Sequence, residues 1–227
     1  MKRIFLLIIF IFFKIQGQEL GVINTDRPDQ SEGTYILPKK ILQIEEGLIF
    51  NKENITNDLM FRYGILQHTE LRLETLFSKY KHIIELDGVV LSAKQRITNG
   101  KELLPAITLV GYANYSIYPE RKLSVEIVSS FEYELINKLS FVGNFGLINQ
   151  FNTYLITSEL NYTPINSLNL FVEYFANFSK EANPDHNIDI GVMYLLTDTW
   201  QIDICLGHSI YNSENKFFLS TGFSHQF

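Results

Sequence analysis

The amino-acid sequence predicts an all-β fold, an antiparallel transmembrane up-and-down β-barrel of about twelve strands. From Ile41 to the end of the chain, apolar and polar residues alternate with a period of two, which is the pattern of strands. No long apolar run follows the N-terminus, and this excludes a helical membrane protein, whose spans each need roughly 18 apolar residues. The chain also holds 18 Phe and 12 Tyr, which suit a lipid-facing surface with an aromatic girdle at each interface.

Residues 1–17 are expected to be a cleaved signal peptide. Lys2 and Arg3 supply a positive start, residues 4–13 form an unbroken apolar run, and Gly17 is a small residue suited to cleavage. An uncleaved anchor is the alternative, but this apolar run is too short to cross a bilayer. The residue directly after the cleavage position is Gln18 and not cysteine, which argues against a lipoprotein. The predicted location is therefore the outer membrane of a Gram-negative bacterium.

Residues 18–40 form a polar segment with two prolines and little periodicity, so no regular structure is expected there. Two interpretations stay open. The segment is either a periplasmic lead-in, in which Asp26 and Arg27 fix a turn, or a plug that folds into the barrel. As a plug, it would bring Arg27 to lumen carboxylates such as Glu126 or Glu132.

Residues 41–227 are predicted to form the barrel. Near the end of the chain, for example, Trp200, Ile202 and Ile204 alternate with polar or small neighbours. An even number of strands is what single-chain bacterial barrels have. Short and more polar linkers alternate along the chain, which places both chain ends in the periplasm. In order, the strands are predicted at 41–50, 58–66, 69–79, 82–97, 104–117, 122–134, 139–150, 153–163, 167–178, 187–196, 199–210 and 216–227.

The fourth predicted strand breaks the alternation. Glu85 and Asp87 lie on one parity, whereas Lys94 and Arg96 lie on the other. A β-bulge near Asp87 and Gly88 would return all four side chains to one face, and glycine is a natural bulge residue.

Charged residues of the polar parity are predicted to line the lumen, because an Arg or Lys facing lipid costs about 2–4 kcal/mol near the midplane. Cations dominate the second to fourth strands and carboxylates the later ones. Such charges either pair across a narrow barrel and stabilise it, or form a polarised pore. The predicted lining residues are Glu45, Arg62, Glu70, Arg72, Glu74, Lys94, Arg96, Glu126, Glu132, Glu159, Glu173, Asp189 and Asp203, with Asp26 and Arg27 as plug candidates.

A soluble β-sandwich or barrel is the competing fold, and it would place the apolar parity inward. Carboxylates and glycines on the polar parity favour a filled lumen instead. The chain also ends on Phe227, and a terminal aromatic residue on an alternating strand is typical of clients of the outer-membrane assembly machinery. The predicted partners are therefore outer-membrane lipid, this machinery and a small-molecule solute.

Other functional classes find little support. The net charge of −6 argues against nucleic acid, which calls for a basic surface. The single cysteine, Cys205, excludes an internal disulfide and a cysteine-based zinc site, and the five histidines lack metal-ligand spacing. A hydrolase would need a nucleophile beside a histidine, but the neighbours in His208-Ser209 and in Ser224-His225 point to opposite faces of a strand. No enzyme activity, metal or cofactor is expected.

Seven short stretches of the chain carry a resemblance to a known family: 24–30, 37–39, 43–47, 69–72, 189–198, 201–203 and 222–227. In these stretches the chain resembles a family of bacterial outer-membrane transporters named for a meta-cleavage pathway of phenol degradation. The resemblance implies an outer-membrane barrel that takes up small molecules. One departure is Ala93-Lys94 in the fourth strand, where the family pairs glycine with lysine.

Taken together, these features predict an outer-membrane transporter or channel for a small solute, with hydrophobic and aromatic solutes among the candidates. A closed structural barrel without a transport role is the first alternative, and a membrane-barrel hydrolase is the second.

Overall fold

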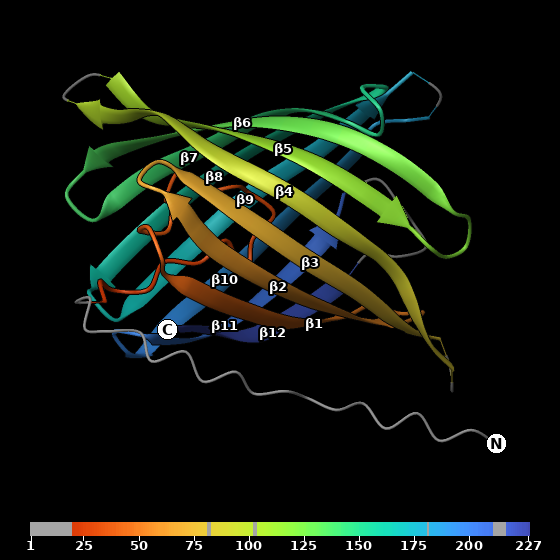
Figure 1. Ribbon diagram of the computed structural model, residues 1–227, viewed down its shortest axis with the longest axis horizontal. Helices are drawn as coiled ribbons and strands as arrows, with labels where there is room; N and C mark the ends of the chain where they lie inside the picture. The colour runs from red at the N-terminus through yellow and green to blue at the C-terminus, as the bar shows by residue number, and fades with distance from the viewer. Residues whose placement is uncertain (1–19, 81–82, 102–103, 181, 211–216) are drawn as a thin grey trace.

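A computed structural model describes residues 20–80, 83–101, 104–180, 182–210 and 217–227 of the chain. The described residues form a closed antiparallel barrel in which each strand pairs with its neighbours in sequence. The first strand pairs with the last, with Gly47 opposite Gly222, so the sheet has no free edge (Figure 1). The predicted signal peptide, residues 1–17, lies outside the described residues.

The predicted fold class and the number of twelve strands are confirmed among the described residues. The boundaries differ by a few residues, mainly because polar ends of β2 and β4 continue the hydrogen-bonded ladder beyond the apolar pattern. The strands are β1 (Leu42–Phe50), β2 (Ile55–Leu66), β3 (Thr69–Tyr80), β4 (Ile83–Lys101), β5 (Leu104–Ser116), β6 (Lys122–Ile136), β7 (Leu139–Ile148), β8 (Thr153–Ile165), β9 (Leu168–Ser179), β10 (Asp185–Thr197), β11 (Trp200–Ser209) and β12 (Phe217–Gln226).

The side-chain pattern is that of a barrel with a polar interior and an apolar exterior. In β11, Ile202 and Ile204 are 43% and 50% exposed, whereas Asp203 between them is 5% exposed. In a soluble barrel the apolar parity would be the buried one, so the competing soluble fold is wrong. The alternation instead matches that of transmembrane barrels, whose outer face is solvated by lipid.

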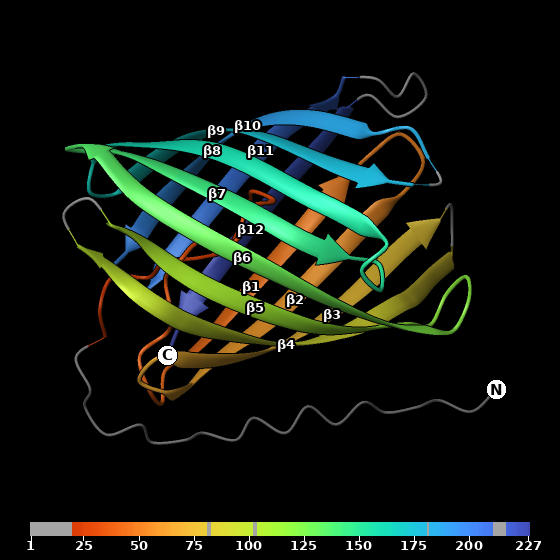
Figure 2. The same ribbon diagram turned by 90° about the horizontal axis from the view of Figure 1, so that it is seen from above.

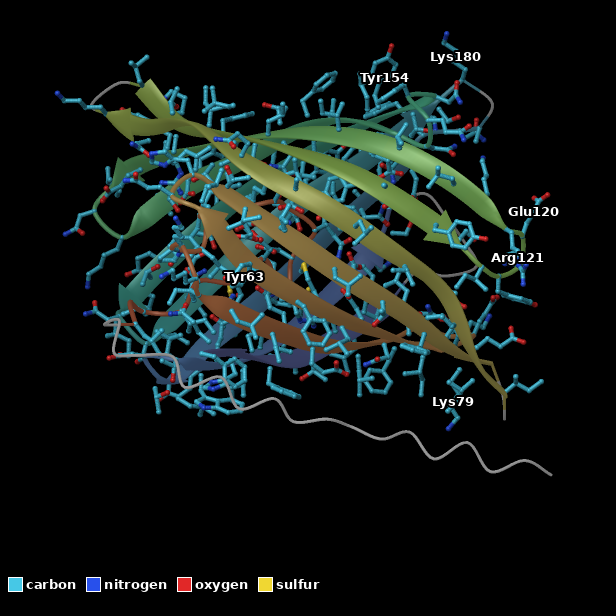
Figure 3. All side chains as sticks on the ribbon, in the orientation of Figure 1. Tyr63, Lys79, Glu120, Arg121, Tyr154 and Lys180 are labelled. Carbon is cyan, nitrogen blue, oxygen red and sulfur yellow. The ribbon has the colours of Figure 1, made fainter. Side chains whose placement is uncertain are left out.

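The outer surface is divided into zones along the barrel. The end that carries the β6–β7, β8–β9 and β10–β11 turns and the C-terminus is called the turn end, and the opposite end the loop end. Figure 3 shows Tyr63 and Tyr154 on the outside toward opposite ends, with Lys79 and Lys180 at the loop end. An apolar belt between aromatic and charged zones is what a bilayer selects. The described residues contain no helix that could span a membrane.

The predicted irregularity of β4 is a β-bulge at Asp87. Leu76 of β3 pairs with Gly88, and the next residue, Phe77, pairs with Leu86, so Asp87 is skipped. Glu85 then lies opposite the buried Ser78. A Cβ atom on Gly88 would lie 2.8 Å from the carbonyl oxygen of Tyr115, so the close approach of β5 requires glycine at this position.

The described residues before β1, 20–41, form the N-terminal segment, which lies inside the barrel. Figures 1 and 2 both show its red to orange trace within the half of the barrel nearest the C-terminus. Leu37 and Ile41 are almost fully buried, at 0% and 1% exposure. The segment is therefore packed against the barrel interior along much of its length.

Candidate functional site

The N-terminal segment is a loop whose two ends are tied to the turn end of the barrel. The Ile23 N–H donates to the carbonyl oxygen of Asp198 at 2.8 Å, in the β10–β11 turn. The Lys40 N–H donates to the carbonyl oxygen of Gly64 at 2.7 Å, near the end of β2. Between these points the chain enters the lumen and returns on the same side. It is not threaded through the barrel.

Asp26 lies among three cations of the barrel wall. Its carboxylate is 3.0 Å from Arg62 Nη2 and 3.0 Å from Lys94 Nζ, and it also accepts a hydrogen bond from Arg72. The Asp26 side chain is 3% exposed. Its backbone N–H donates to Glu45 Oε2 at 3.2 Å, so both the side chain and the main chain bind the wall.

The same wall also pairs with itself. Glu70 accepts from Arg62 Nε at 2.7 Å and from Arg72 Nε at 2.7 Å, and Glu45 accepts from Arg62 Nη1 at 2.6 Å. Wall residues Arg62, Arg72 and Lys94 outnumber Glu45 and Glu70 here, and the segment supplies the missing negative charge. Because unpaired charges are costly in a buried site, this wall favours a segment that carries carboxylates.

Glu32 is the second such carboxylate. It lies 2.9 Å from Arg72 Nη1 and 3.3 Å from Lys94 Nζ, and the Tyr112 hydroxyl donates a hydrogen bond to it. Burial opposes ionisation of Glu32, but Arg72, Lys94 and the Tyr112 hydrogen bond together lower its pKa to about 2. Glu32 is therefore ionised at neutral pH. Its main chain exchanges hydrogen bonds with the Asn144 side chain at 2.7 and 2.9 Å.

Arg27 extends toward the seam where β1, β2, β11 and β12 meet. Its Nη2 atom lies 3.4 Å from Asp203 and 3.1 Å from the Ser220 hydroxyl, and Nη1 lies 3.8 Å from Asp58. A Cβ atom on Gly47 or on Gly222 would overlap the guanidinium group, so the absence of a side chain at these two positions makes room for it.

The predicted pairing of Arg27 with Glu126 or Glu132 is wrong. Glu132 accepts from the Thr34 hydroxyl at 2.6 Å, and Glu126 accepts from the Asn149 N–H at 3.1 Å near the loop end. The parity of a strand determines which face a side chain is on. It determines neither the depth of the side chain nor its position around the barrel, and Arg27 turns toward a different part of the wall.

Three neighbouring strands carry carboxylates on the opposite wall. Glu159 pairs directly across from Glu173, and Glu173 across from Asp189, so the three side chains lie side by side. They are 2%, 1% and 2% exposed. Glu173 accepts from the Gln30 N–H at 2.8 Å and from the Ser31 hydroxyl at 2.5 Å. Within the described part of the chain, none of the three forms an ion pair.

Asp29 belongs to the segment and faces this acidic wall. Burial raises its pKa well above the ordinary value of 3.8, and the neighbouring Glu159 and Glu173 carboxylates raise it further. The segment thus contacts two walls of opposite character. Asp26 and Glu32 contact the cations of β2, β3 and β4, and the Gln30 amide and the Ser31 hydroxyl donate to Glu173 of β9.

A cavity of about 250 Å³ lies between the segment and the acidic wall. Its lining extends into the β8–β9 turn through Asn166 and Ser167, which places it toward the turn end. Asp29, Glu132 and Glu159 supply its carboxylates.

The predicted lining residues fall into two groups. Glu74, Arg96, Glu126 and Glu132 are partly exposed, and Arg96 Nη2 donates to the Thr34 carbonyl oxygen at 2.6 Å. The buried group comprises Glu45, Arg62, Glu70, Arg72, Lys94, Glu159, Glu173, Asp189 and Asp203.

Sequence reasoning missed Glu32, Asp58 and Tyr112. Glu32 lies in a segment without periodicity, and Asp58 stands at the very start of the predicted strand 58–66. The aromatic content predicts tyrosines mainly at the lipid face, whereas the Tyr112 hydroxyl donates to Glu32 inside the barrel. The alternation of β5 does offer a signal for it, because Tyr112 shares the parity of the buried Val110.

The histidine–serine pairs are split between the two faces. Ser224 is fully buried, whereas the His225 ring stacks on Trp200 with centroids 4.0 Å apart. Ser209 is also buried, whereas the His208 ring contacts Phe217 at 4.5 Å. Neither pair brings a hydroxyl and an imidazole together. Among the described residues, no group of three or more His, Cys, Asp or Glu side chains could hold a metal ion.

Solved structures of similar fold are outer-membrane barrels. The KdgM porin shares 11% sequence identity at a TM-score of 0.67, over 82% of this chain and 99% of that chain. An outer membrane channel from Pseudomonas putida F1 shares 12% identity at a TM-score of 0.63, over 90% and 100%. The CymD monoaromatic hydrocarbon channel shares 8% identity at a TM-score of 0.50, over 84% and 89%. Identities this low establish the fold alone.

No curated protein matches the sequence. One family profile does, and its match covers residues 25–227. It therefore includes most of the N-terminal segment as well as every strand of the barrel. The chain belongs to the family described as "Putative MetA-pathway of phenol degradation".

Proposed function

We propose that the protein is an outer-membrane channel for a small solute, and that its N-terminal segment is a plug that closes the lumen. The observation that carries this proposal is the double attachment of the segment. Asp26 and Glu32 complete the charge of a basic wall, while Gln30 and Ser31 bind an acidic one. A lead-in that only fixed a turn outside the barrel would need neither set of contacts.

The location follows from the outer surface. An apolar belt with aromatic residues toward both ends suits a bilayer, and export through a signal peptide cleaved near Gly17 delivers the chain to it. Both ends of the segment, and the C-terminus, lie at the turn end, which we assign to the periplasm. Phe227 is 42% exposed at the end of the last strand, where it is accessible to the assembly machinery.

The contacts that hold the plug in the lumen are reversible. Ion pairs and hydrogen bonds hold it, and these groups can be solvated by water once the segment leaves the barrel. Because both of its ends lie at the turn end, the loop can withdraw toward the periplasm without passing through the wall. Gating by an order–disorder change of such a segment is a known form of switching.

The solute is assigned by class only. Solved barrels of this fold include a porin and a monoaromatic hydrocarbon channel, which supports passage of small molecules in general. We assign no enzymatic reaction, because the hydroxyl and imidazole groups of His208-Ser209 and Ser224-His225 lie on opposite faces of the wall.

A permanently closed structural barrel is the second candidate, and the dense ion-pair network around Asp26 favours it. The two candidates differ in one measurement, the single-channel conductance of residues 18–227 and of a variant lacking residues 18–38. We expect rare openings from the intact chain and frequent, salt-dependent steps from the variant. Heat-modifiable migration in gels would verify that both barrels are folded. Equal conductance of the two chains would rule out the plug.

A further inference from the structure

The cavity beside the plug has the lining of a binding site for a cation. Three of its lining residues are carboxylates: Asp29 from the segment, Glu132 from β6 and Glu159 from β8. Among the described residues that line it, there is no Lys, Arg or His. Arg62, Arg72 and Lys94 lie on the opposite wall around Asp26, and Arg27 is turned toward Asp58 and Asp203. The ionisable side chains that a ligand meets in the described lining are therefore all acidic.

The carboxylates of the cavity also have unused hydrogen-bonding capacity. Glu159 is 2% exposed, yet its Oε2 atom has no hydrogen-bond partner among the described residues. The Oδ1 atom of Asp29 also lacks a partner in the described part of the chain, and the Asp29 and Glu159 carboxyl groups lie close enough to share a hydrogen bond. Buried acceptors in native proteins are nearly always paired, so this pattern indicates a donor that binds here.

Hydrogen-bonded amide side chains connect the turn end of the barrel with Glu159. The Asn169 amide donates to Asn161 Oδ1 at 2.7 Å, and the Asn161 amide in turn donates to Glu159. The Thr163 hydroxyl donates to Asn169 Oδ1 at 3.1 Å. These groups can bind the polar remainder of a ligand whose charge lies at the carboxylates.

Two other ligand classes fit less well. No aromatic ring is among the described residues that line the cavity, so a flat hydrocarbon would find no ring to stack on. A bound metal ion is disfavoured by geometry, because the described carboxylates do not converge as metal ligands. An organic cation needs no such convergence, since its ammonium or guanidinium protons are spread over several donors.

We propose that this cavity binds a small organic cation with hydrogen-bonding groups, its charged nitrogen between Asp29 and Glu159. This inference rests on the proposed function and deepens it by naming the class of solute. Because Asp29 is part of the plug, the bound cation contacts the plug itself. Cation binding and the position of the segment are therefore linked.

Isothermal titration of refolded residues 18–227 in an uncharged detergent tests the proposal at pH 7. Putrescine is the probe, and its matched controls are the neutral butane-1,4-diol and the anionic succinate. We expect saturable binding of one putrescine per barrel, with each control at least tenfold weaker. Equal binding of the diol, or no saturable binding of putrescine, would overturn the proposal.

Variants then locate the site. Glu159→Gln should weaken putrescine binding at least tenfold, whereas Glu120→Gln, at an exposed position in the β5–β6 loop, should leave it unchanged. If Glu159→Gln does not fold, Asp29→Asn serves the same purpose, because Asp29 lies in the plug and not in a strand of the barrel. Unchanged affinity in a folded variant would overturn the assignment. Binding without conductance would contradict only the channel, and conductance without binding only the cation site.

Discussion

Replacing Asp26 by asparagine should release the plug. The substitution keeps the size of the side chain but removes its charge from a position within 3.0 Å of both Arg62 and Lys94 and hydrogen-bonded to Arg72. The variant leaves these three buried cations with one carboxylate fewer. Glu45 and Glu70 belong to the wall and remain paired with the cations. The substitution therefore destabilises the closed position of the segment.

The size of the effect follows from the burial of the pair. Removing one partner of a buried ion pair destabilises by about 3–5 kcal/mol. We take the lower end, about 3 kcal/mol, because the remaining carboxylates still compensate part of the positive charge. Since about 1.4 kcal/mol is a tenfold change in an equilibrium constant, the open population of the segment should rise roughly 100-fold.

Amide hydrogen exchange measures this population directly. In the closed position the N–H groups of Gln30 and Leu37 donate to Glu173 and Glu70 at 2.8 and 2.9 Å. Their protection should fall roughly 100-fold in the variant, in line with the free-energy change. Peptides from the middle of the strands should exchange as in the unaltered chain.

The matched control is Glu53→Gln, which removes a carboxylate from an exposed position in the β1–β2 loop. Its exchange pattern should equal that of the unaltered chain. If Asp26→Asn also leaves residues 20–41 protected, the ion pairs do not hold the segment. The reasoning from charge compensation would then be refuted.

Four further predictions concern the plug and the wall. The pKa of Glu32, about 2, lies below its ordinary value of 4.5, so its contribution to plug closure is present above pH 4.5 and is lost as the pH falls toward 2; in Glu32→Gln this acid-dependent loss of exchange protection should disappear. The raised pKa of Asp29 acts in the opposite direction: its contribution is complete below pH 3.8 and is lost as the pH rises through the raised value, and Asp29→Asn should abolish that loss. Gly47→Ala should displace the guanidinium of the segment and increase exchange of residues 20–41 at least tenfold, whereas Gly111→Ala, with open space around its Cβ position, should not. Ile190→Arg, on the lipid face at 62% exposure, should lower the free energy of unfolding in vesicles by about 2–4 kcal/mol, and Ile190→Leu should change it by less than about 1.5 kcal/mol.

The sequence was most informative about the faces of the strands. A period of two assigns each side chain to one side of the sheet, so Ile202 and Asp203 could be placed outside and inside without coordinates. The same rule identified the bulge at Asp87, because the charges of β4 could share one face only if a residue was skipped. These inferences depend on local geometry, which neighbouring residues determine.

The arrangement inside the lumen could not be predicted in the same way. Which residues meet across a barrel depends on strand stagger and on the path of a segment without periodicity. Arg27 therefore meets Asp58 and Asp203, not the two glutamates that parity alone suggested. Glu32 gave no sign of its importance, since its partners Arg72 and Lys94 are contributed by distant parts of the chain.

The central claim, a channel closed by its own N-terminal segment, is tested most directly by locking that segment in place. The hydroxyl oxygens of Ser31 and Thr157 are 2.6 Å apart, so cysteines at both positions can form a disulfide between the segment and β8. Single-channel conductance would be recorded from this variant with Cys205 replaced by serine. We predict silence under oxidising conditions and salt-dependent openings after reduction. Openings of equal size and frequency in both states would contradict the account, as would silence of the reduced, folded barrel.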